Sequence, residues 1–291
     1  MRRAFLQLHL AVLLAGFTGI LGRLITLNEG LLVWYRLLFS ALTLWILFFI
    51  TGKLQRIPIK ECLKIFGVGL IAALHWVTFY GSIKYANVSV ALVCFSAIGF
   101  FTAIFEPLVF RKRINAWELL LGLMAIGGIY IIFHFDPEYK VGIILGIISA
   151  LLGCLFPIFN RIFLRKHSAE TVTVYELTGG LLSLSVILPF YLQLFPADHV
   201  IPTRDDFLWL LVLSWFCTVL AFQLSMNALK KISAFTVNLS YNLEPVYGIL
   251  LAFAIYQENK ELDSSFYAGL AIILLAVALQ TLSVYIRHRK K

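Results

Sequence analysis

Long apolar stretches, separated by short polar connections, fill the 291-residue chain. About twenty apolar residues cross the hydrocarbon core of a bilayer, and these stretches lack the alternation of a barrel strand, so each is predicted to be a transmembrane helix. The predicted spans are 4–22, 31–51, 65–84, 87–110, 117–134, 141–164, 171–193, 207–229, 233–256 and 264–286. The pattern therefore predicts an all-α membrane protein with ten transmembrane helices.

Composition supports this interpretation. Hydrophobic residues make up 61% of the chain, charged residues 13%, and the mean hydropathy is +0.91, which excludes an ordinary soluble globule. The longest connection, around residues 195–206, is too short to be a domain, so the membrane bundle itself must perform the function. The first span lacks a signal-peptide cleavage pattern and is expected to remain in the mature protein.

The formal net charge of +9 is explained by topology. Most of the 24 Lys and Arg residues lie at the chain ends and in connections that would share one side of the membrane. The other side is predicted to carry only Arg23, Lys84, Lys140, Arg204 and Lys260. Because basic residues favour the cytoplasmic side, both termini are predicted to be cytoplasmic. The charge does not point to a nucleic-acid partner.

An internal repeat relates residues 1–136 to residues 137–291. In this register Lys84-Tyr85-Ala86 matches Lys230-Lys231-Ile232, and Val33–Leu37 matches Thr173–Leu177. Five spans is an odd number, so the second repeat must enter the membrane from the opposite side. Two inverted five-helix repeats in one bundle are typical of secondary transporters. The alternative is a duplication in a membrane protein that transports nothing.

Several features carry a resemblance to a known family. They are Arg36 early in the second span, the Lys84-Tyr85-Ala86 turn, the Leu243-Glu244-Pro245 stretch before an apolar run ending at Glu258, and the glycine-rich fifth and tenth spans. On these grounds the whole chain resembles the drug/metabolite transporter superfamily, and specifically its EamA-type permeases. The resemblance implies a proton-linked or facilitated exporter of amino acids or similar small metabolites in a bacterial inner membrane.

The first repeat departs from the family pattern at two places. Gly99 stands where a proline is common, and Arg111-Lys112-Arg113 stands where Gly-Glu-Arg is common. These departures leave the predicted fold unchanged, but a substrate cannot be carried over from any one member.

Ionisable side chains within spans are costly in lipid and are candidates for function. The strongest is Glu244, roughly 16 Å deep at 1.5 Å per residue. It precedes Pro245, whose ring leaves a backbone carbonyl free, and it lies beside Tyr241 and Asn242. Such a carboxylate is suited to take a proton or a substrate amine. The alternative is a structural carboxyl group kept protonated by burial and hydrogen-bonded between helices.

Arg36 keeps its charge, so it requires an anion, a water-filled cavity or a route to the membrane surface. The two interpretations are a binding or gating residue for a substrate carboxylate, and a surface anchor. Glu106, which precedes Pro107, is expected to pair with Arg111 or Lys112.

Glu176 lies near the predicted cytoplasmic end of its span. Arg161 and Arg165 in the preceding region are available to pair with it. Structural pairing is the favoured interpretation, and a cytoplasmic gate is the alternative.

Further candidates for the substrate or coupling pathway lie midway through the third and eighth spans. His75, Trp76 and Tyr80 are in the third span, and Gln223 and Asn227 are among their repeat counterparts in the eighth. A histidine at this depth can relay protons. The alternative is a hydrogen-bonded core histidine, with the aromatic residues lining an apolar cavity.

Small residues and prolines indicate how the helices pack. Gly142 and Gly146 form a GxxxG pattern in the sixth span, and Gly127-Gly128 thins the fifth. Close helix packing is favoured, with homodimerisation through spans five and ten as the alternative. Pro107, Pro157 and Pro245 are expected to kink the fourth, sixth and ninth spans.

The motifs of several other functions are absent from the sequence. The four cysteines lack CxxC or histidine spacing, so no metal site or thiol nucleophile is predicted. No GxSxG, HExxH or GxxxxGK[ST] pattern occurs, so neither an enzyme nor ATP-driven transport is expected, and no cofactor is predicted. The partners expected are a small-molecule substrate and membrane lipids. Alternatives are an exporter of small organic cations or drugs, a lipid-carrier flippase, and, more remotely, an intramembrane enzyme.

Overall fold

Helices alone build the computed structural model, which describes residues 2–135, 137–232, 234–241 and 243–289 and places no strand in them. The first half contains α1 (Arg2–Leu24), α2 (Glu29–Ile50), α3 (Ile59–Tyr85), α4 (Val88–Phe95), α5 (Ile98–Phe110) and α6 (Ala116–Phe135). The second half contains η1 (Pro137–Tyr139), α7 (Lys140–Phe163), α8 (Ala169–Leu194), α9 (Arg204–Ser214), the π-helix η2 (Trp215–Leu220), α10 (Ala221–Leu229), α11 (Ala234–Tyr241), α12 (Glu244–Tyr256), η3 (Glu258–Lys260) and α13 (Ser264–Arg289).

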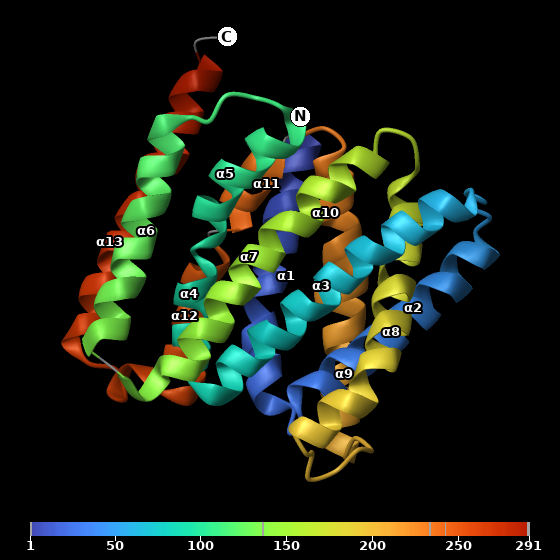
Figure 1. Cartoon of the computed structure of the whole chain (residues 1–291), viewed down its shortest axis with the longest axis horizontal. Helices are drawn as coiled ribbons and strands as arrows, with labels where there is room; N and C mark the ends of the chain where they lie inside the picture. The colour runs from blue at the N-terminus through green and yellow to red at the C-terminus, as the bar shows by residue number, and fades with distance from the viewer. Residues whose placement is uncertain (1, 136, 233, 242, 290–291) are drawn as a thin grey trace.

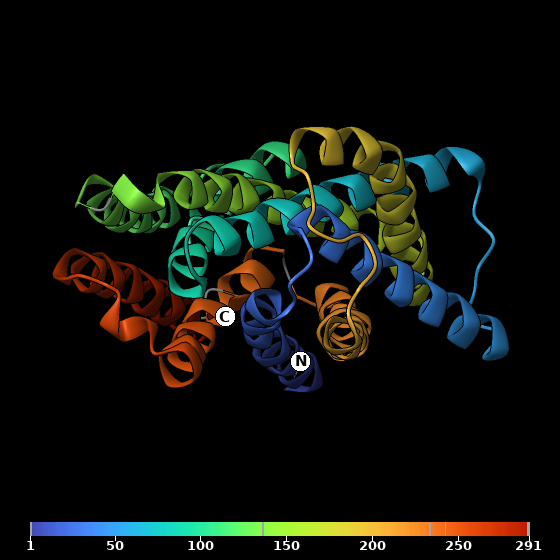
Figure 2. The same ribbon diagram turned by 90° about the horizontal axis from the view of Figure 1, so that it is seen from below.

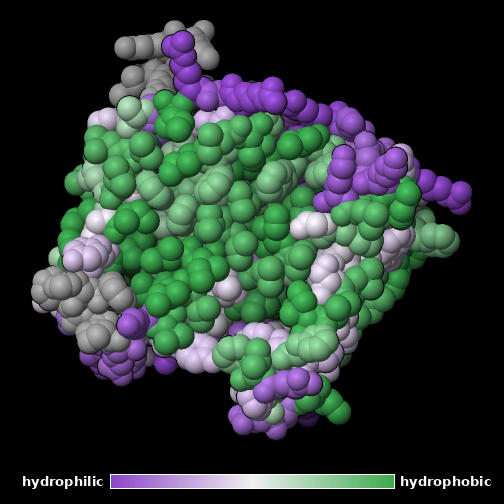
Figure 3. Space-filling model, in the orientation of Figure 1, coloured by the Kyte–Doolittle hydropathy of each residue, from purple (hydrophilic) through white to green (hydrophobic). Residues whose placement is uncertain are grey.

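Seven of the described helical segments are long and apolar enough to cross a bilayer. They correspond to the predicted first, second, third, fourth, sixth, seventh and eighth spans. The predicted fifth and tenth spans correspond to the shorter apolar stretches Ala116–Ile132 of α6 and Ser264–Gln280 of α13, and the predicted ninth contains α12, Glu244–Tyr256. Figure 3 shows a broad apolar surface between two hydrophilic edges, as expected of a protein embedded in lipid.

The connections between helices gather at two ends of the bundle (Figure 1). We call one end the termini face; it carries the N-terminus and the connections of residues 51–58, 111–115, 164–168 and 230–232. The other end, the opposite face, carries the connections of residues 25–28, 86–87, 195–203 and 257–263.

Two helices in the middle of the bundle are interrupted in the same way. The predicted span 87–110 is divided into α4 and α5, because the N–H groups of Ser96 and Ala97 donate to carbonyls only three residues back, at 3.1 Å each. The other break separates α11 from α12, where Leu243 N donates to Ser240 O at 3.1 Å. Pro245 lies in the first turn of α12, so it begins a new helix instead of kinking a continuous one.

The lengths and ends of the interrupted helices also correspond. α4 has eight residues and α11 has eight described residues before the break, and α5 and α12 each have thirteen after it. Arg111 ends α5 at φ 52° and Gln257 ends α12 at φ 55°, and both residues adopt the left-handed conformation that terminates helices. Arg111 and Gln257 are counterparts in the sequence repeat. Pro107 and Pro157 lie inside α5 and α7.

Glycines bring helices into close contact within the chain. A Cβ on Gly128 of α6 would lie 2.7 Å from the carbonyl oxygen of Gly269 on α13, and these helices run side by side at one edge of the bundle (Figures 1 and 2). A Cβ on Gly146 of α7 would lie 2.6 Å from Cys94 Cβ. The structure therefore uses these glycines for packing within one chain, whereas Gly127 faces open space.

Candidate functional site

A cavity of about 80 Å³ lies between the two helix breaks. Phe95 and Ile98 line it on either side of the α4–α5 break, and Tyr241 and Glu244 line it on either side of the α11–α12 break. Side chains from α1, α2, α3, α7 and α10 complete the wall. The space accommodates a few water molecules. Both halves of the chain therefore build one shared site.

Arg36 is 2% exposed and projects from α2 into this cavity. Its Nε donates to Thr218 Oγ1 at 2.7 Å, one Nη donates to the Tyr80 hydroxyl at 2.8 Å, and the other Nη lies 3.4 Å from the carbonyl oxygen of Cys217. Its guanidinium stacks over the Trp76 ring, 4.1 Å from the centroid. A guanidinium has five N–H donors, so these contacts leave donors free to bind an anion.

The π-helix η2 positions the groups that hold Arg36. Its wider turns allow Thr218 Oγ1 to donate to Leu213 O, five residues back, at 2.9 Å while it accepts from Arg36. The same segment directs the Cys217 carbonyl toward the guanidinium. Single π turns within α-helices often occur at functional sites.

Glu244, the first residue of α12, is 6% exposed and lines the same cavity. Arg36 is near enough to attract its carboxylate electrostatically. However, no carboxylate oxygen of the described residues lies within 4.0 Å of Arg36. The cavity thus places one cation and one carboxyl group near each other without joining them in an ion pair.

Aromatic rings form much of the remaining wall. Phe156 and Phe222 stack with their centroids 6.0 Å apart, and Trp76 meets Phe222 edge-on at 6.2 Å. His75 also lines the cavity, but its Nδ1 is held by the backbone carbonyl and the hydroxyl of Ser149, both at 2.9 Å. Of the aromatic residues named from the third span, Trp76 lines the cavity, and His75 lines it as a hydrogen-bonded residue.

The other predicted binding residues divide into three groups. Tyr80 is fully buried beside Arg36 and supports it without lining the cavity. Gln223 and Asn227 of α10 lie outside the lining, because the cavity-facing side of that helix is formed by other residues. Asn242 lies outside the described residues.

The acidic residues near the termini face pair differently from the sequence expectation. Glu106 accepts from Arg161 at 3.0 Å, because α5 packs against α7, and not from its sequence neighbours Arg111 and Lys112. Glu176 consequently has no ion pair with Arg161. Its carboxylate lies beside the side chain of Asn160, which lines the cavity.

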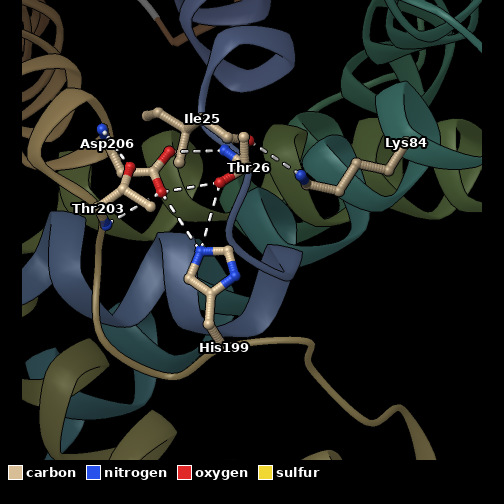
Figure 4. Close-up of polar contacts among 6 residues, drawn as sticks. All are labelled: Ile25, Thr26, Lys84, His199, Thr203 and Asp206. Carbon is tan, nitrogen blue, oxygen red and sulfur yellow. Dashed lines mark hydrogen bonds and ion pairs between the residues drawn. The ribbon is translucent and has the colours of Figure 1, made fainter.

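At the opposite face, Asp206 fastens α9 to the α1–α2 connection (Figure 4). Its carboxylate accepts from Thr26 N at 2.7 Å, from the Thr26 hydroxyl at 2.8 Å and from Thr203 N at 3.3 Å. The Thr203 hydroxyl oxygen accepts the capping bond from Asp206 N at 3.1 Å, and His199 Nε2 lies 3.4 Å from the carboxylate. Lys84 donates to the Ile25 carbonyl at 3.1 Å.

Glu258 makes a second connection at the opposite face. Its fully buried carboxylate accepts from Val88 N at 3.1 Å, Ser89 N at 2.9 Å and the Ser89 hydroxyl at 2.6 Å, and so caps the N-terminus of α4. Arg23 of α1 donates to the same carboxylate at 2.5 Å. Glu258 and Asp206 belong to the second half, and their partners in α1, α4 and the α1–α2 connection belong to the first.

The roles of these connecting residues, and those of Thr218, Cys217 and Asn160, were not predicted from the sequence. A signal existed only for Thr203 and Asp206, whose spacing matches a capping box. The other partners are distant in sequence. No group of three His, Cys, Asp or Glu side chains placed to hold a metal ion occurs in the described part of the chain.

Similarity to known proteins covers most of the chain. The sequence model of the EamA-like transporter family matches it twice, over residues 2–134 and 140–282. An uncharacterized transporter of Haemophilus influenzae is 21% identical over 273 residues, which is 88% of this chain and 86% of the relative. One of Archaeoglobus fulgidus is 24% identical over 225 residues, covering 75% and 74%. A crystal structure of a protein with 19% identity shares the fold, with a TM-score of 0.69 over 96% of each chain.

Proposed function

The chain belongs to the EamA-like transporter family, and we propose that it exports amino acids or related small metabolites by alternating access. The observation that carries this proposal is the presence of both Arg36 and Glu244 on the wall of one buried cavity, near each other but not joined in an ion pair. Free guanidinium donors suit a substrate carboxylate, and the neighbouring carboxyl group suits a substrate amine or a proton.

The two interrupted helices support an inverted pair of repeats as the basis of alternating access. α4 and α5 run from the opposite face to the termini face, whereas α11 and α12 run the other way, and the helix after each break has thirteen residues. Broken helices that meet around a central site are a common arrangement in secondary transporters. With the fifth, ninth and tenth segments included, this arrangement contains ten transmembrane segments.

In this conformation the cavity extends toward the termini face. Asn160 and Leu229, which lie in the last turns of α7 and α10 at that face, belong to the cavity wall. The Asp206 and Glu258 connections close the other end. Because basic connections favour the cytoplasmic side, the termini face is cytoplasmic in this proposal and the host membrane is a bacterial inner membrane.

A comparison of medium metabolites tests the proposal. Cells overproduce the wild type, Glu244→Gln, Arg36→Gln, Arg113→Gln or an empty vector, at matched membrane levels. Arg113 is exposed at the termini face and serves as the control for loss of a positive charge. We expect a defined amino acid or related metabolite to accumulate with the wild type and Arg113→Gln, and at least tenfold less with Arg36→Gln, because a buried charged contact contributes about 2–5 kcal/mol.

Two results would change this interpretation. Export that is unaltered in both Arg36→Gln and Glu244→Gln would remove the cavity as the binding site. Indistinguishable profiles for all five cultures would favour export of small organic cations, for which the buried carboxylate of Glu244 among Trp76, Phe222 and Tyr241 provides a suitable environment.

A further inference from the structure

Three polar side chains at the α7–α8 side of the cavity are completely buried and make no hydrogen bond with the described residues. They are Asn160, Thr173 and Glu176, each 0% exposed. Thr173 and Glu176 are three residues apart on α8, so they share one face of that helix. Asn160 approaches from α7 closely enough to interact with the Glu176 carboxylate, although neither group attains normal hydrogen-bond geometry.

No basic side chain is available to neutralise Glu176 in the described structure. The packed segments 37–50 of α2, 65–74 of α3 and 221–229 of α10 contain no ionisable residue. Toward the N-terminus of α3, Cys62 lies two turns before Gly69. The preceding residue, Glu61, is paired with His167 and Lys166. α7 contributes Cys154, whose thiol donates to Leu151 O, and Arg161, which is paired with Glu106.

A buried, unpaired carboxylate is too costly to persist, so a cation must neutralise it. The packing restricts the size of that cation. Glu176 lies where α8 crosses α3, and a Cβ added to Gly69 would lie only 2.6 Å from Gly180 N. Glu176 is also absent from the cavity lining. A proton needs no coordination shell, whereas a metal ion requires space for several oxygen ligands.

We propose that Glu176 is a proton-binding site, distinct from Glu244, that exchanges its proton with water in the cavity, and that the Asn160 side chain separates it from that water. Asn160 takes this position because it lines the cavity and also lies beside Glu176, without a hydrogen bond between the two side chains. The proton moves between a Glu176 carboxylate oxygen and a cavity water that reaches it when the Asn160 side chain turns aside, and no other bond changes. The use of this proton in transport rests on the proposed function, whereas its presence on Glu176 does not.

Infrared spectroscopy of the full-length protein, purified into lipid bilayers, tests this site without any substrate. A protonated carboxyl group has a C=O stretching band that an ionised carboxylate lacks. We expect the Glu176 band to be lost in Glu176→Gln. Glu106→Gln is the matched control, because Glu106 is also buried near the termini face but faces Arg161; the band should remain there. Asn160→Ala should shift the band without removing it, which keeps the test valid if Glu176→Gln does not fold.

Two results would overturn the inference. One is a set of protonated-carboxyl bands that is the same in the wild type and in folded Glu176→Gln. The other is a Glu176 band that appears only when choline replaces sodium, because a metal ion would then be the bound cation. Metabolite export is measured separately. If Glu176→Gln loses the band but the wild type exports no metabolite, the transport proposal is refuted and the proton site remains supported.

Discussion

The two ends of the bundle differ in how their buried polar groups are satisfied. At the opposite face, the carboxylates of Asp206 and Glu258 are almost fully buried, and each accepts at least three hydrogen bonds. Near the termini face, Asn160 and Glu176 are equally buried but lack hydrogen bonds in the described structure. Fully bonded buried polar groups rigidify the contact that they join, whereas a buried polar group without a partner is energetically costly. The opposite face is therefore the locked end of this conformation.

The strongest test of this difference is Glu258→Ala. It removes the acceptor for two backbone N–H groups at the start of α4 and for Arg23. Hydrogen bonds to a charged group contribute about 1.5–3 kcal/mol each, so we expect a loss of about 3 kcal/mol in unfolding free energy, measured by tryptophan fluorescence in detergent. Glu261→Ala, at an exposed position in the same connection, is the control. Equal stability of the two variants would contradict a lock at Glu258.

Asp206→Ala should have the next largest effect. It releases the Thr26 backbone and hydroxyl and one half of the capping box at Thr203. We expect a loss of about 2 kcal/mol, because a lost cap and an unsatisfied backbone donor each cost about 1–2 kcal/mol. The loss is measured as the difference in unfolding free energy from the wild type. Asp205→Ala is the control, since Asp205 is exposed on the same turn. A smaller loss than that of Asp205→Ala would break the proposed role.

At the termini face, Glu106→Gln should cost less. Its partner Arg161 is partly exposed, at 26% of its side chain, and can turn toward solvent. We expect a loss of about 1 kcal/mol in the same unfolding measurement. A loss as large as that of Glu258→Ala would show that both ends are locked equally.

Glu61→Gln should have the smallest effect. Glu61 accepts from Lys166 at 3.3 Å and from His167, but its side chain is 26% exposed and that of Lys166 is 68% exposed. Exposed pairs of this kind contribute about 0–1 kcal/mol and weaken in salt. Unfolding at low and high ionic strength should differ by less than about 1 kcal/mol between the variant and the wild type. A larger, salt-independent loss would indicate a buried tie at this face as well.

The sequence predicts the helical elements well because bilayer thickness fixes the length of an apolar span. Seven predicted spans recur as long apolar helices, and the two-repeat organisation recurs in the family match. The break at Ser96 and Ala97 was not predicted, because no proline marks it in the sequence. It is visible only in the backbone hydrogen bonds that reach three residues back. A break near Pro245 was visible as a kink only.

The site was predicted in part. Five of the predicted residues line one cavity: Arg36, Glu244, His75, Trp76 and Tyr241. They were predictable because polar and ionisable side chains are rare within apolar spans and therefore stand out in the sequence. Partners far apart in sequence were not predictable. Arg161 lies 55 positions from Glu106. Glu258 lies 170 positions from Val88 and 169 from Ser89, whose N–H groups donate hydrogen bonds to it. Only packing brings them together.

Labelling of a cysteine in the cavity tests the central claim most directly. Ser225→Cys places one thiol on the cavity wall after Cys62, Cys94, Cys154 and Cys217 are replaced, and a C-terminal tag identifies the termini face of sealed vesicles. A membrane-impermeant maleimide should react at least tenfold faster from the termini face than from the opposite face, and adding Glu258→Ala should raise the rate from the opposite face. Equal or faster labelling from the opposite face in the otherwise unaltered protein would contradict a locked opposite face.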